Sequence, residues 1–264
     1  MVSRICGYAN LMWLLFKTDM QVYFSKIFIG EFIDSMIWAG SSMFLGAYIF
    51  PELGMASSYG ALFAIGLLAT VSFWDIWSIS TKYVADLEGN RTIEYYLTLP
   101  LPATLYFIKQ VISHAARMGI IGLSMLPLAK LILLQRLDLS HLRIVHFGII
   151  LISSVVFCAV MSLIMASMVK DINNIGHVGI RILFPMWFFS GAQFSWQTLY
   201  KFSPVTAYIC LINPLLYAME GMRAAVLGQP GYLPFWLCVA MLWIFNLLFA
   251  WIGIVRMERR LDCV

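Results

Sequence analysis

The sequence has 264 residues, of which 62% are hydrophobic and only 11% are charged, with a formal net charge of +4. A soluble domain carries about 25% charged residues. With about half the usual share of charged residues, a soluble domain of this size would leave much of its surface apolar in water. The composition therefore predicts a polytopic membrane protein. It excludes a disordered chain, a disulfide scaffold and a nucleic-acid binder. The five cysteines form no CxxC pair, and their spacing indicates no metal site.

The first predicted element is an amphipathic helix over residues 1–28. Its hydrophobic residues recur at helical spacing, with polar residues between them. They are Tyr8, Leu11, Met12, Leu15, Phe16, Val22, Tyr23 and Ile27. Such a stripe is typical of a helix that lies in the membrane surface. The alternative is a helix packed on the membrane domain, and both can hold at once.

Six apolar stretches are long enough to cross a hydrocarbon core of about 30 Å, which needs about 20 residues of helix. They cover residues 29–50, 60–80, 103–128, 144–169, 178–194 and 233–255. No linker divides the chain, so we expect an all-α protein with one transmembrane domain, residues 1–264.

The positive charges predict the orientation of these spans. With the amino terminus in the cytoplasm, eleven Lys and Arg residues fall on the inner side and five on the outer side. This excess favours cytoplasmic positions for both termini. The basic loop after the third span, which contains Lys130, Arg136 and Arg143, argues the other way.

The longest inner loop, residues 81–101, separates the second and third spans. Asn90 is a good N-cap and Pro100 ends the segment, so we expect a short helix over about residues 91–99. One face of this helix would be apolar, formed by Ile93, Tyr96 and Leu97. An exposed apolar face favours docking of a partner. The alternative is that the helix folds back on its own membrane domain.

Six titratable side chains fall within the predicted spans, where a buried charge costs about 2.5–3.5 kcal/mol on insertion scales. They are Glu31, Asp34, Asp75, His114, Arg117 and Arg181. One hypothesis is that some of them face a water-filled translocation path. The other is that Arg117 or Arg181 pairs with Asp75 or Glu31 to join helices.

The region before the last span, residues 188–231, consists of apolar pieces punctuated by glycine and proline. Pieces of about 10 to 14 residues are too short to cross a membrane and are typical of re-entrant helices. We therefore expect an outer gate here. Its candidate residues are Phe189, Gly191, Phe194, Asn213, Pro214, Glu220 and Arg223. Glu220 and Arg223 share a helix face, which favours a local pair.

Two further patterns concern packing. Small residues recur every fourth position in the fourth span and predict close approach of another helix; they are Ser154, Cys158, Ser162 and Ala166. Aromatic residues gather where the fifth span ends, namely Trp187, Phe188, Phe189, Phe194 and Trp196. Such a group is typical of an interfacial belt, and the alternative is stacking on a sugar or lipid in transit.

Catalytic and nucleotide-binding motifs are absent from the sequence. No Gly-Lys pair occurs, so the chain has no P-loop, and neither HExxH nor GxSxG is present. The four histidines are scattered singly. We therefore expect neither an enzyme nor a metal site. A membrane-embedded lipid or glycan transferase, or a scaffold that recruits a soluble partner, is the alternative.

Two stretches resemble the type-2 exporter class of ABC transporter permeases. The first runs from Glu88-Gly-Asn-Arg-Thr-Ile-Glu94 to Leu99-Pro100 in the inner loop. The second comprises Phe189-Ser-Gly-Ala-Gln-Phe194, Leu211-Ile-Asn-Pro-Leu-Leu-Tyr-Ala218 and Gly221-Met-Arg223, followed by the basic residues 256–260. Their order and spacing extend the resemblance over essentially the whole chain. Gln193 and Ser195 depart from it, because the family more often has apolar residues or proline there.

The resemblance implies that this chain is the transmembrane subunit of an ATP-driven exporter in the bacterial cytoplasmic membrane. Two copies, or this chain and a related permease, would enclose the path within the lipid bilayer. The chain itself would bind no cofactor, since a separate ATPase subunit would use ATP and Mg²⁺. That subunit would dock on the inner loop through Glu88, Gly89, Arg91, Thr92, Ile93, Glu94, Tyr96, Leu97 and Pro100.

Overall fold

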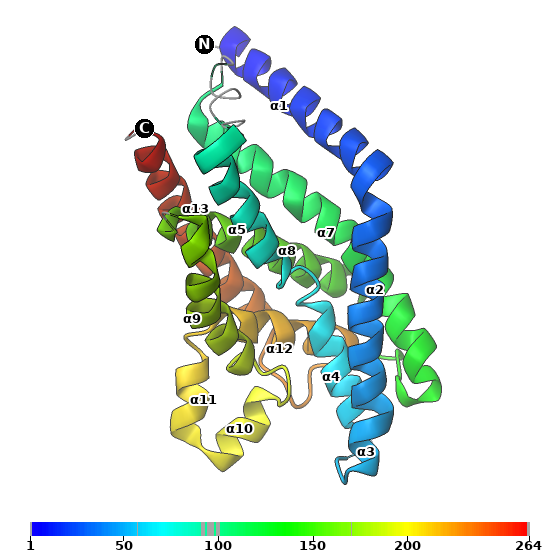
Figure 1. The fold of residues 1–264 in the computed structure, drawn as a ribbon. Helices are drawn as coiled ribbons and strands as arrows, with labels where there is room; N and C mark the ends of the chain where they lie inside the picture. The colour runs from blue at the N-terminus through cyan, green and yellow to red at the C-terminus, as the bar shows by residue number, and fades with distance from the viewer. Residues whose placement is uncertain are drawn as a thin grey trace.

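The computed structural model describes residues 2–56, 58–90, 93, 98, 101–169 and 171–262. Every regular element in these ranges is a helix, and no strand occurs among them. Figure 1 shows long helices packed together, with shorter helices across one end. The fold is therefore that of an all-α polytopic membrane protein, as composition and periodicity predict.

The chain begins with a long bent arm. α1 (Val2–Val22) continues through a π-helical turn, η1 (Tyr23–Ile27), into α2 (Phe28–Phe44). Figure 1 shows α1 turning away from the line of α2, and π-helical turns are a known cause of such bends. Four residues of the predicted hydrophobic stripe pack against the core, namely Tyr8, Leu11, Met12 and Leu15. Trp13 and Leu14, which lie between them, are exposed. The amino-terminal helix thus packs on the membrane domain, which was the second of the two predicted arrangements.

The predicted second span, residues 60–80, is not one helix. α4 (Tyr59–Leu68) ends before an irregular stretch, and α5 (Asp75–Ala85) begins after it. In that stretch the Thr70 hydroxyl donates to the carbonyl oxygen three residues earlier, at 3.0 Å. Such short-range side-chain bonds compete with the helical ones. The remaining short helical turns of this half are η2 (Leu45–Ile49), α3 (Phe50–Glu52) and η3 (Asp86–Asn90).

In the described part of the chain, three helices are long and apolar enough to cross a membrane: α7 (Ala103–Leu133), α8 (Ile144–Met168) and α13 (Phe235–Asp262). A short turn, η4 (Leu134–Arg136), extends α7. α8 is the most buried of the three. The ridge of small residues on α8 is buried. α5 approaches it closely, because the hydroxyl of Ser80 on α5 donates to the Ser162 carbonyl at 3.0 Å.

Short helices form the region before the last long helix, as the glycines and prolines predict. α9 (Ile175–Phe188), preceded by the turn η5 (Ile172–Asn174), is shorter than the predicted fifth span, residues 178–194. Three residues after its end, Gly191 adopts a φ of 78°, a conformation that glycine accepts readily. The helices that follow are α10 (Trp196–Phe202), α11 (Pro204–Cys210) and α12 (Pro214–Val226).

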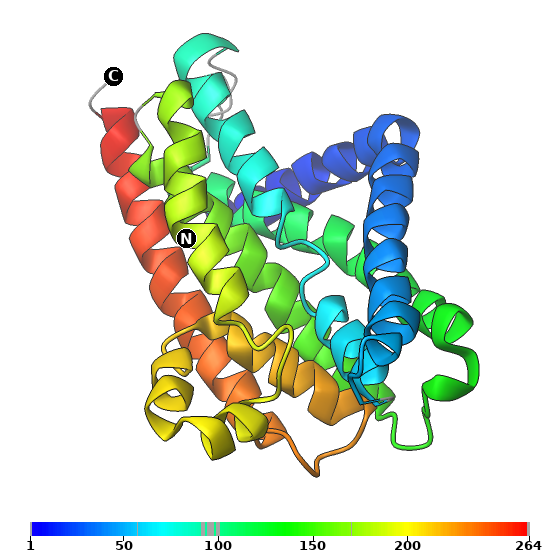
Figure 2. The ribbon, with the colours of Figure 1, turned by 60° about the horizontal axis from the view of Figure 1, so that its bottom comes forward.

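The span count follows from these lengths. Among the residues that the structure describes, three helices qualify as spans, and a fourth results if α11 and α12, which meet at 98°, form one broken span. The predicted count of six stays a prediction, because its first, second and fifth spans consist of shorter or π-interrupted helices. Figure 1 shows α1 beginning and α13 ending at the same end of the molecule, near η3. Figure 2 shows α10 and α11 lying across the opposite end.

Candidate functional site

A polar cavity of about 200 Å³ lies inside the bundle, between α2, α5 and α7. Four of the six predicted intramembrane residues line it: Glu31, Asp75, His114 and Arg117. Its other lining residues include Lys82, Tyr83 and Gln110, which the sequence analysis did not select. Asp75 reaches this position because α5 begins at that residue, directly after the irregular stretch.

Arg117 contacts this cavity without an ion pair. Among the described side chains, no carboxylate lies within 4.0 Å of its guanidinium. Its Nε atom donates to the Ser113 carbonyl at 3.3 Å, and its Cζ atom lies 5.4 Å from the centre of the Tyr23 ring. The arrangement is a cation–π contact. Direct pairing of Arg117 with Asp75 or Glu31, the second hypothesis from the sequence, is therefore not what the structure shows.

His114 is the most enclosed polar group of the cavity. Its side chain is 3% exposed, and neither ring nitrogen has a hydrogen-bond partner among the described residues. One carboxylate oxygen of Glu31 is in the same situation. Buried polar atoms are normally hydrogen-bonded, and a polar cavity of this volume accommodates several water molecules. These groups can therefore be satisfied through water.

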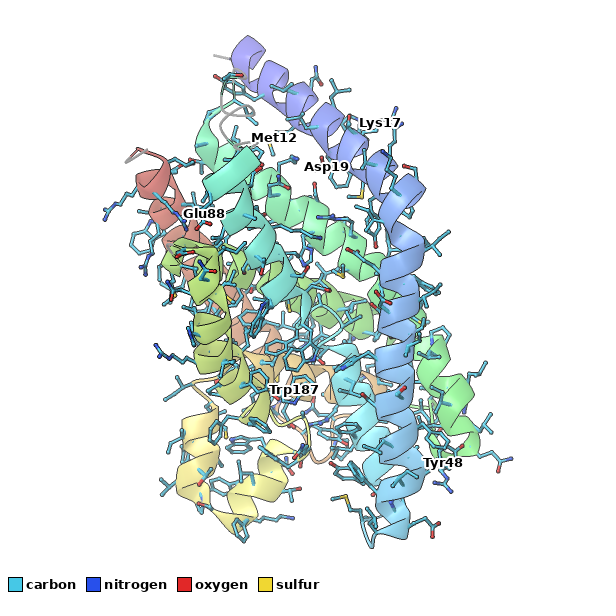
Figure 3. The ribbon with its side chains drawn as sticks, viewed as in Figure 1. Met12, Lys17, Asp19, Tyr48, Glu88 and Trp187 are labelled. Atoms are coloured by element: carbon cyan, nitrogen blue, oxygen red, sulfur yellow. The ribbon has the colours of Figure 1, made fainter. Side chains whose placement is uncertain are left out.

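The two remaining intramembrane residues lie elsewhere. Asp34 lines a neighbouring cavity of about 170 Å³ whose wall also includes Asp75, so that carboxylate borders both cavities. Arg181 is exposed on α9 and lines neither cavity. The wall of the second cavity also contains Trp38 and Trp74. Their ring centres lie 6.1 and 5.4 Å from that of Trp187, which therefore belongs to an internal aromatic cluster (Figure 3).

A polar stripe on α7 holds the amino-terminal arm against the bundle. Lys109, Ser113 and Arg117 recur every fourth residue, and each contacts the arm or its neighbour on the stripe. Lys109 Nζ lies 2.6 Å from the Asp19 carboxylate, which also accepts from the Ser113 hydroxyl at 3.1 Å. Figure 3 shows Asp19 on the side of α1 that faces the bundle. This contact was not among the predicted ones, although the four-residue spacing of Lys109, Ser113 and Arg117 is visible in the sequence.

At the opposite end, the predicted outer-gate residues Glu220 and Arg223 form a fully buried ion pair. Arg223 Nη1 lies 3.2 Å from Glu220 Oε1, and both side chains are 0% exposed. The guanidinium also donates to the backbone carbonyls of Leu62, Ala192 and Phe194 at 2.9 to 3.0 Å. The local pairing that the sequence predicted is confirmed.

The Glu220 carboxylate and its surroundings extend this pair into a network. Its two oxygens accept from the backbone N–H groups of Trp196 and Leu233, at 3.2 and 3.1 Å. A Cβ atom at Gly66 would lie 2.6 Å from Arg223 Nη2, so α4 leaves just enough room for the guanidinium. The network therefore joins α4 and α12 to the segment between α9 and α10 and to the segment that follows α12.

The other outer-gate candidates lie around this network. Asn213 caps α12 by accepting from the Leu215 N–H, and its amide donates to the Met186 carbonyl at 2.6 Å. Pro214 is the first residue of α12, where its missing N–H costs nothing. Gly191 makes the turn after α9, while Phe189 is exposed and Phe194 is half-buried. Whether these residues act as a gate stays a prediction.

Hydrogen bonds fix the inner loop to the helix bundle, at the end of the molecule where α1 begins and α13 ends. The Glu88 carboxylate accepts from the Ile172 N–H at 2.9 Å, and the Asp86 carboxylate accepts from the Ile93 N–H at 2.8 Å. Arg260 of α13 donates to the carbonyls of Ala166, at 2.8 Å, and Val169. The ends of α5, α8 and α13 therefore meet at this loop.

Of the nine predicted docking residues, the structure describes Glu88, Gly89 and Ile93. Ile93 is 2% exposed and belongs to the hydrophobic core, so its predicted place on an exposed apolar face is wrong. Glu88 and Gly89 are exposed. The other candidates lie outside the described residues: Arg91, Thr92, Glu94, Tyr96, Leu97 and Pro100.

Comparison with protein families gives one result. The family model described as ABC-2 type transporter matches residues 11–227, which is most of the chain and includes the polar cavity, the ion pair of Glu220 and Arg223, and the inner loop. No curated protein matches the sequence.

Proposed function

Since this chain belongs to the ABC-2 type transporter family, we propose that it is the transmembrane subunit of an ATP-driven exporter. ATP hydrolysis takes place in a separate ATPase subunit, which docks on the inner loop at residues 81–101. Members of this family work with ABC ATPases in general, and the absence of a P-loop from this sequence agrees with that division of labour.

The observation that carries the proposal is the anchoring of the inner loop. η3 is bonded through Glu88 to η5 and through Asp86 to Ile93, and Ile93 is packed in the core. A loop fixed in this way transmits a push from a docked subunit to the helices behind it. A loose loop would absorb the push. Rigid-body movement of packed helices is a common mode of such switching.

The polar cavity supports a route for cargo through the same helices. Carboxylates and cationic groups at this depth are costly and normally serve a function. The cavity of one copy, about 200 Å³, is small. We therefore propose a second permease copy, identical or related, whose helices complete the path.

The arrangement of the chain ends supports an orientation for the complex. α1 begins and α13 ends beside η3 (Figure 1), and the excess of positive charge predicts that this end faces the cytoplasm. We propose that both termini and the docking loop lie on the cytoplasmic side of the bacterial inner membrane. The network around Arg223 then lies toward the outer side.

The test is a substitution on the exposed part of the loop. Gly89→Trp adds bulk where a Cβ atom meets nothing within 4 Å, so the chain itself has room for it. Ile93 is unsuitable, because a polar substitution there would damage the core. We expect the Gly89→Trp permease to lose co-purification with its ATPase and to lose stimulation of ATP hydrolysis in proteoliposomes.

The control is Gly30→Trp, an exposed glycine on α2 that also has open space around it. This variant should bind the ATPase and stimulate hydrolysis as the parent does. Unchanged binding and hydrolysis by the Gly89→Trp complex would show that the ATPase does not dock at this loop.

A further inference from the structure

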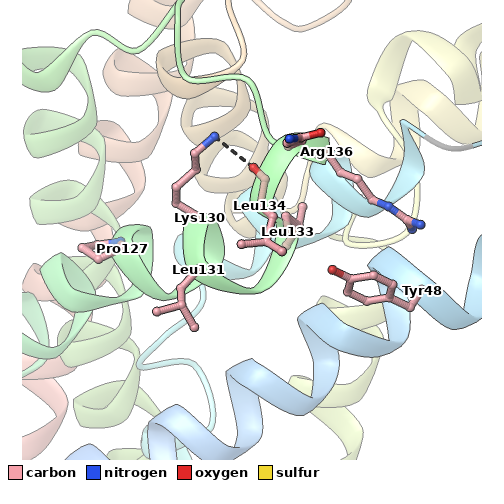
Figure 4. A pocket seen from close by; sticks show the side chains of 8 residues that line it. Tyr48, Pro127, Lys130, Leu131, Leu133, Leu134 and Arg136 are labelled. Carbon is pink, nitrogen blue, oxygen red and sulfur yellow. Dashed lines mark hydrogen bonds between the residues drawn. The ribbon is translucent and has the colours of Figure 1, made fainter.

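Two exposed cations at the outer end of α7 are held by backbone carbonyls of the chain itself. Lys130 Nζ donates to the carbonyls of Leu134 and Leu137, at 2.9 and 2.7 Å. The Arg136 guanidinium donates to the Ala47 carbonyl. Figure 4 shows the two side chains pointing to opposite sides of the end of α7. These cations are therefore satisfied within the chain.

Two exposed charges within the predicted spans have no such partners. They are Asp34 on α2 and Arg181 on α9. Neither side chain has a hydrogen-bond or ion-pair partner among the residues that the structure describes. A charge surrounded by lipid is costly, and charged side chains in membrane segments normally face protein or water. The sides of α2 and α9 that carry these charges are therefore poor surfaces for contact with lipid chains.

Asp34 and Arg181 lie on the same face of the bundle. Asp34 lines the cavity of about 170 Å³ whose wall also contains Trp74 and Asp75. Phe184, three residues after Arg181 on the same side of α9, has its ring centre 5.8 Å from that of Trp74. Figures 1 and 2 both show α5 between α2 and α9. We call the exposed sides of α2 and α9 that carry these two charges the α2/α9 face.

The two charges also lie at nearly the same depth. The ring centres of Trp38 on α2 and Trp187 on α9 are 6.1 Å apart. Asp34 precedes Trp38 by four residues, and Arg181 precedes Trp187 by six. Both helices run away from the end that holds the chain termini (Figure 1), so at about 1.5 Å per residue the charges lie about 6 and 9 Å from this contact, in the same direction. An arginine side chain easily covers the difference.

Opposite charge at equal depth suits a twofold axis along the membrane normal. In such a contact each copy presents the same surface, so α2 of each copy meets α9 of the other. Asp34 of each copy then meets Arg181 of the other. The charges are surrounded by large, exposed apolar side chains: Ile33 and Ile37 on α2, and Ile180, Phe184 and Phe188 on α9. Complementary charges fix the register of such a contact, and the apolar residues around them supply its buried area.

We propose that a second copy of this chain covers the α2/α9 face, and that Asp34 of each copy pairs with Arg181 of the other. The inference rests on the proposed function, which calls for a second permease copy, and it identifies that copy as identical and names its contact surface. The second copy also completes the cavity beside Asp34. The lining residues of that cavity include two carboxylates, Asp34 and Asp75, and no cation, and Arg181 of the second copy supplies one.

The first test is cross-linking between two differently tagged copies in native membranes. One copy carries Asp34→Cys and the other Arg181→Cys, so the second Asp34 and Arg181 pair of the dimer stays intact. Both copies carry Cys6→Ser and Cys263→Ser, and the other three cysteines are buried. The reagent is a short bis-methanethiosulfonate, because an Asp and Arg pair holds its Cα atoms farther apart than the roughly 7 Å that a disulfide allows. We expect a product that carries both tags.

The matched control combines Arg181→Cys with Ile112→Cys. Ile112 is 48% exposed and lines an apolar groove between α7 and α8, outside the α2/α9 face. This combination should give little product with both tags. A contact between the two positions within one chain gives none either, because the two thiols are on different copies.

The second test reverses the charges and measures dimerisation of the purified chain by light scattering. Asp34→Arg places like charges together at both contacts of the dimer. A close interfacial charge pair contributes at least about tenfold, so this variant should weaken dimerisation by about 100-fold. Arg181→Asp should do the same, and the double variant Asp34→Arg/Arg181→Asp should recover most of the dimer. Both positions are exposed, so all three variants should melt as the parent does.

Three results would overturn the proposal. A parent that forms no homodimer would mean that the second copy is a related chain. Product from Asp34→Cys with Arg181→Cys no greater than from the control would place the dimer contact on another face. A double variant that folds but recovers no dimer would mean that the two charges do not meet. None of these results affects docking of the ATPase, which co-purification with the parent chain measures separately, whereas a cross-linked dimer that binds no ATPase would keep this contact and refute the proposed function.

Discussion

Replacing Arg223 with methionine removes the centre of the outer network while preserving most of the side chain's length. Glu220 would then keep a carboxylate with 0% exposure and no cation, and breaking a buried pair from one side costs about 3–5 kcal/mol. The carbonyls of Leu62, Ala192 and Phe194 would each lose a donor. An unsatisfied buried group costs about 1–3 kcal/mol, so about 4 kcal/mol is a conservative expectation for Arg223→Met.

The assay is thermal unfolding of the purified chain, followed with a dye that becomes fluorescent on reaction with thiols. Cys158, Cys210 and Cys238 are free and buried, so they react only when the bundle opens. Replacing the other two cysteines, Cys6 and Cys263, by serine removes the terminal thiols from the signal. At about 2–4 °C for each kcal/mol, the melting temperature of Arg223→Met should fall by about 10 °C.

Two further variants decide how the loss is interpreted. Arg143→Met removes an exposed arginine from the same side and should melt within about 2 °C of the parent. The double variant Glu220→Gln/Arg223→Met removes the stranded charge but keeps an amide oxygen as acceptor for the backbone N–H groups around it, so it should melt above Arg223→Met. If Arg223→Met melts together with the Arg143→Met control, the network does not hold the outer helices, and the reasoning above is refuted.

Three other contacts yield predictions that the same unfolding assay, or hydrogen exchange, can check. Gly60→Ala places a Cβ atom 2.6 Å from a backbone atom of η2 and should lower the melting temperature, whereas Gly119→Ala meets nothing within 4 Å and should be neutral or slightly stabilising. Lys109→Met removes the cation that holds Asp19 against α7 and leaves only the Ser113 contact, so the amides of α1 should exchange faster while those of α8 do not change. Asn213→Ala removes the cap of α12 and should cost about 1–2 kcal/mol; unchanged melting would mean that the cap contributes nothing.

The sequence predicted the polar cavity in part, because the cost of burying charge draws attention to each charged residue in an apolar stretch. This argument found Glu31, Asp75, His114 and Arg117, which do meet. It passed over Lys82, because this residue lies two positions beyond the predicted second span, residues 60–80. Its spacing of seven residues from Asp75 places both on one face of a helix and could have identified it.

The backbone irregularities could not be predicted from the same pattern. Hydrophobicity reports which segments avoid water and says little about where a helix breaks, so the stretch between α4 and α5 looked like part of one span. The same holds for η2, which contains no charged residue and lies within the predicted first span. Ile93 was misplaced because an apolar face can meet a partner or the chain's own core, and only tertiary packing decides between them.

The break between α4 and α5 gives the proposed coupling a mechanical route. α5 is an 11-residue helix, a rod of about 16 Å. It carries the Asp75 carboxylate of the polar cavity at its first turn and leads directly into the anchored η3 at its other end. The Ser80 hydroxyl, near its middle, is bonded to α8. Because α5 is separated from α4 by the break, a push on η3 can tilt α5 on this contact and shift Asp75 without bending a helix. An uninterrupted second span, as the sequence alone predicted, would have had to move over its whole length.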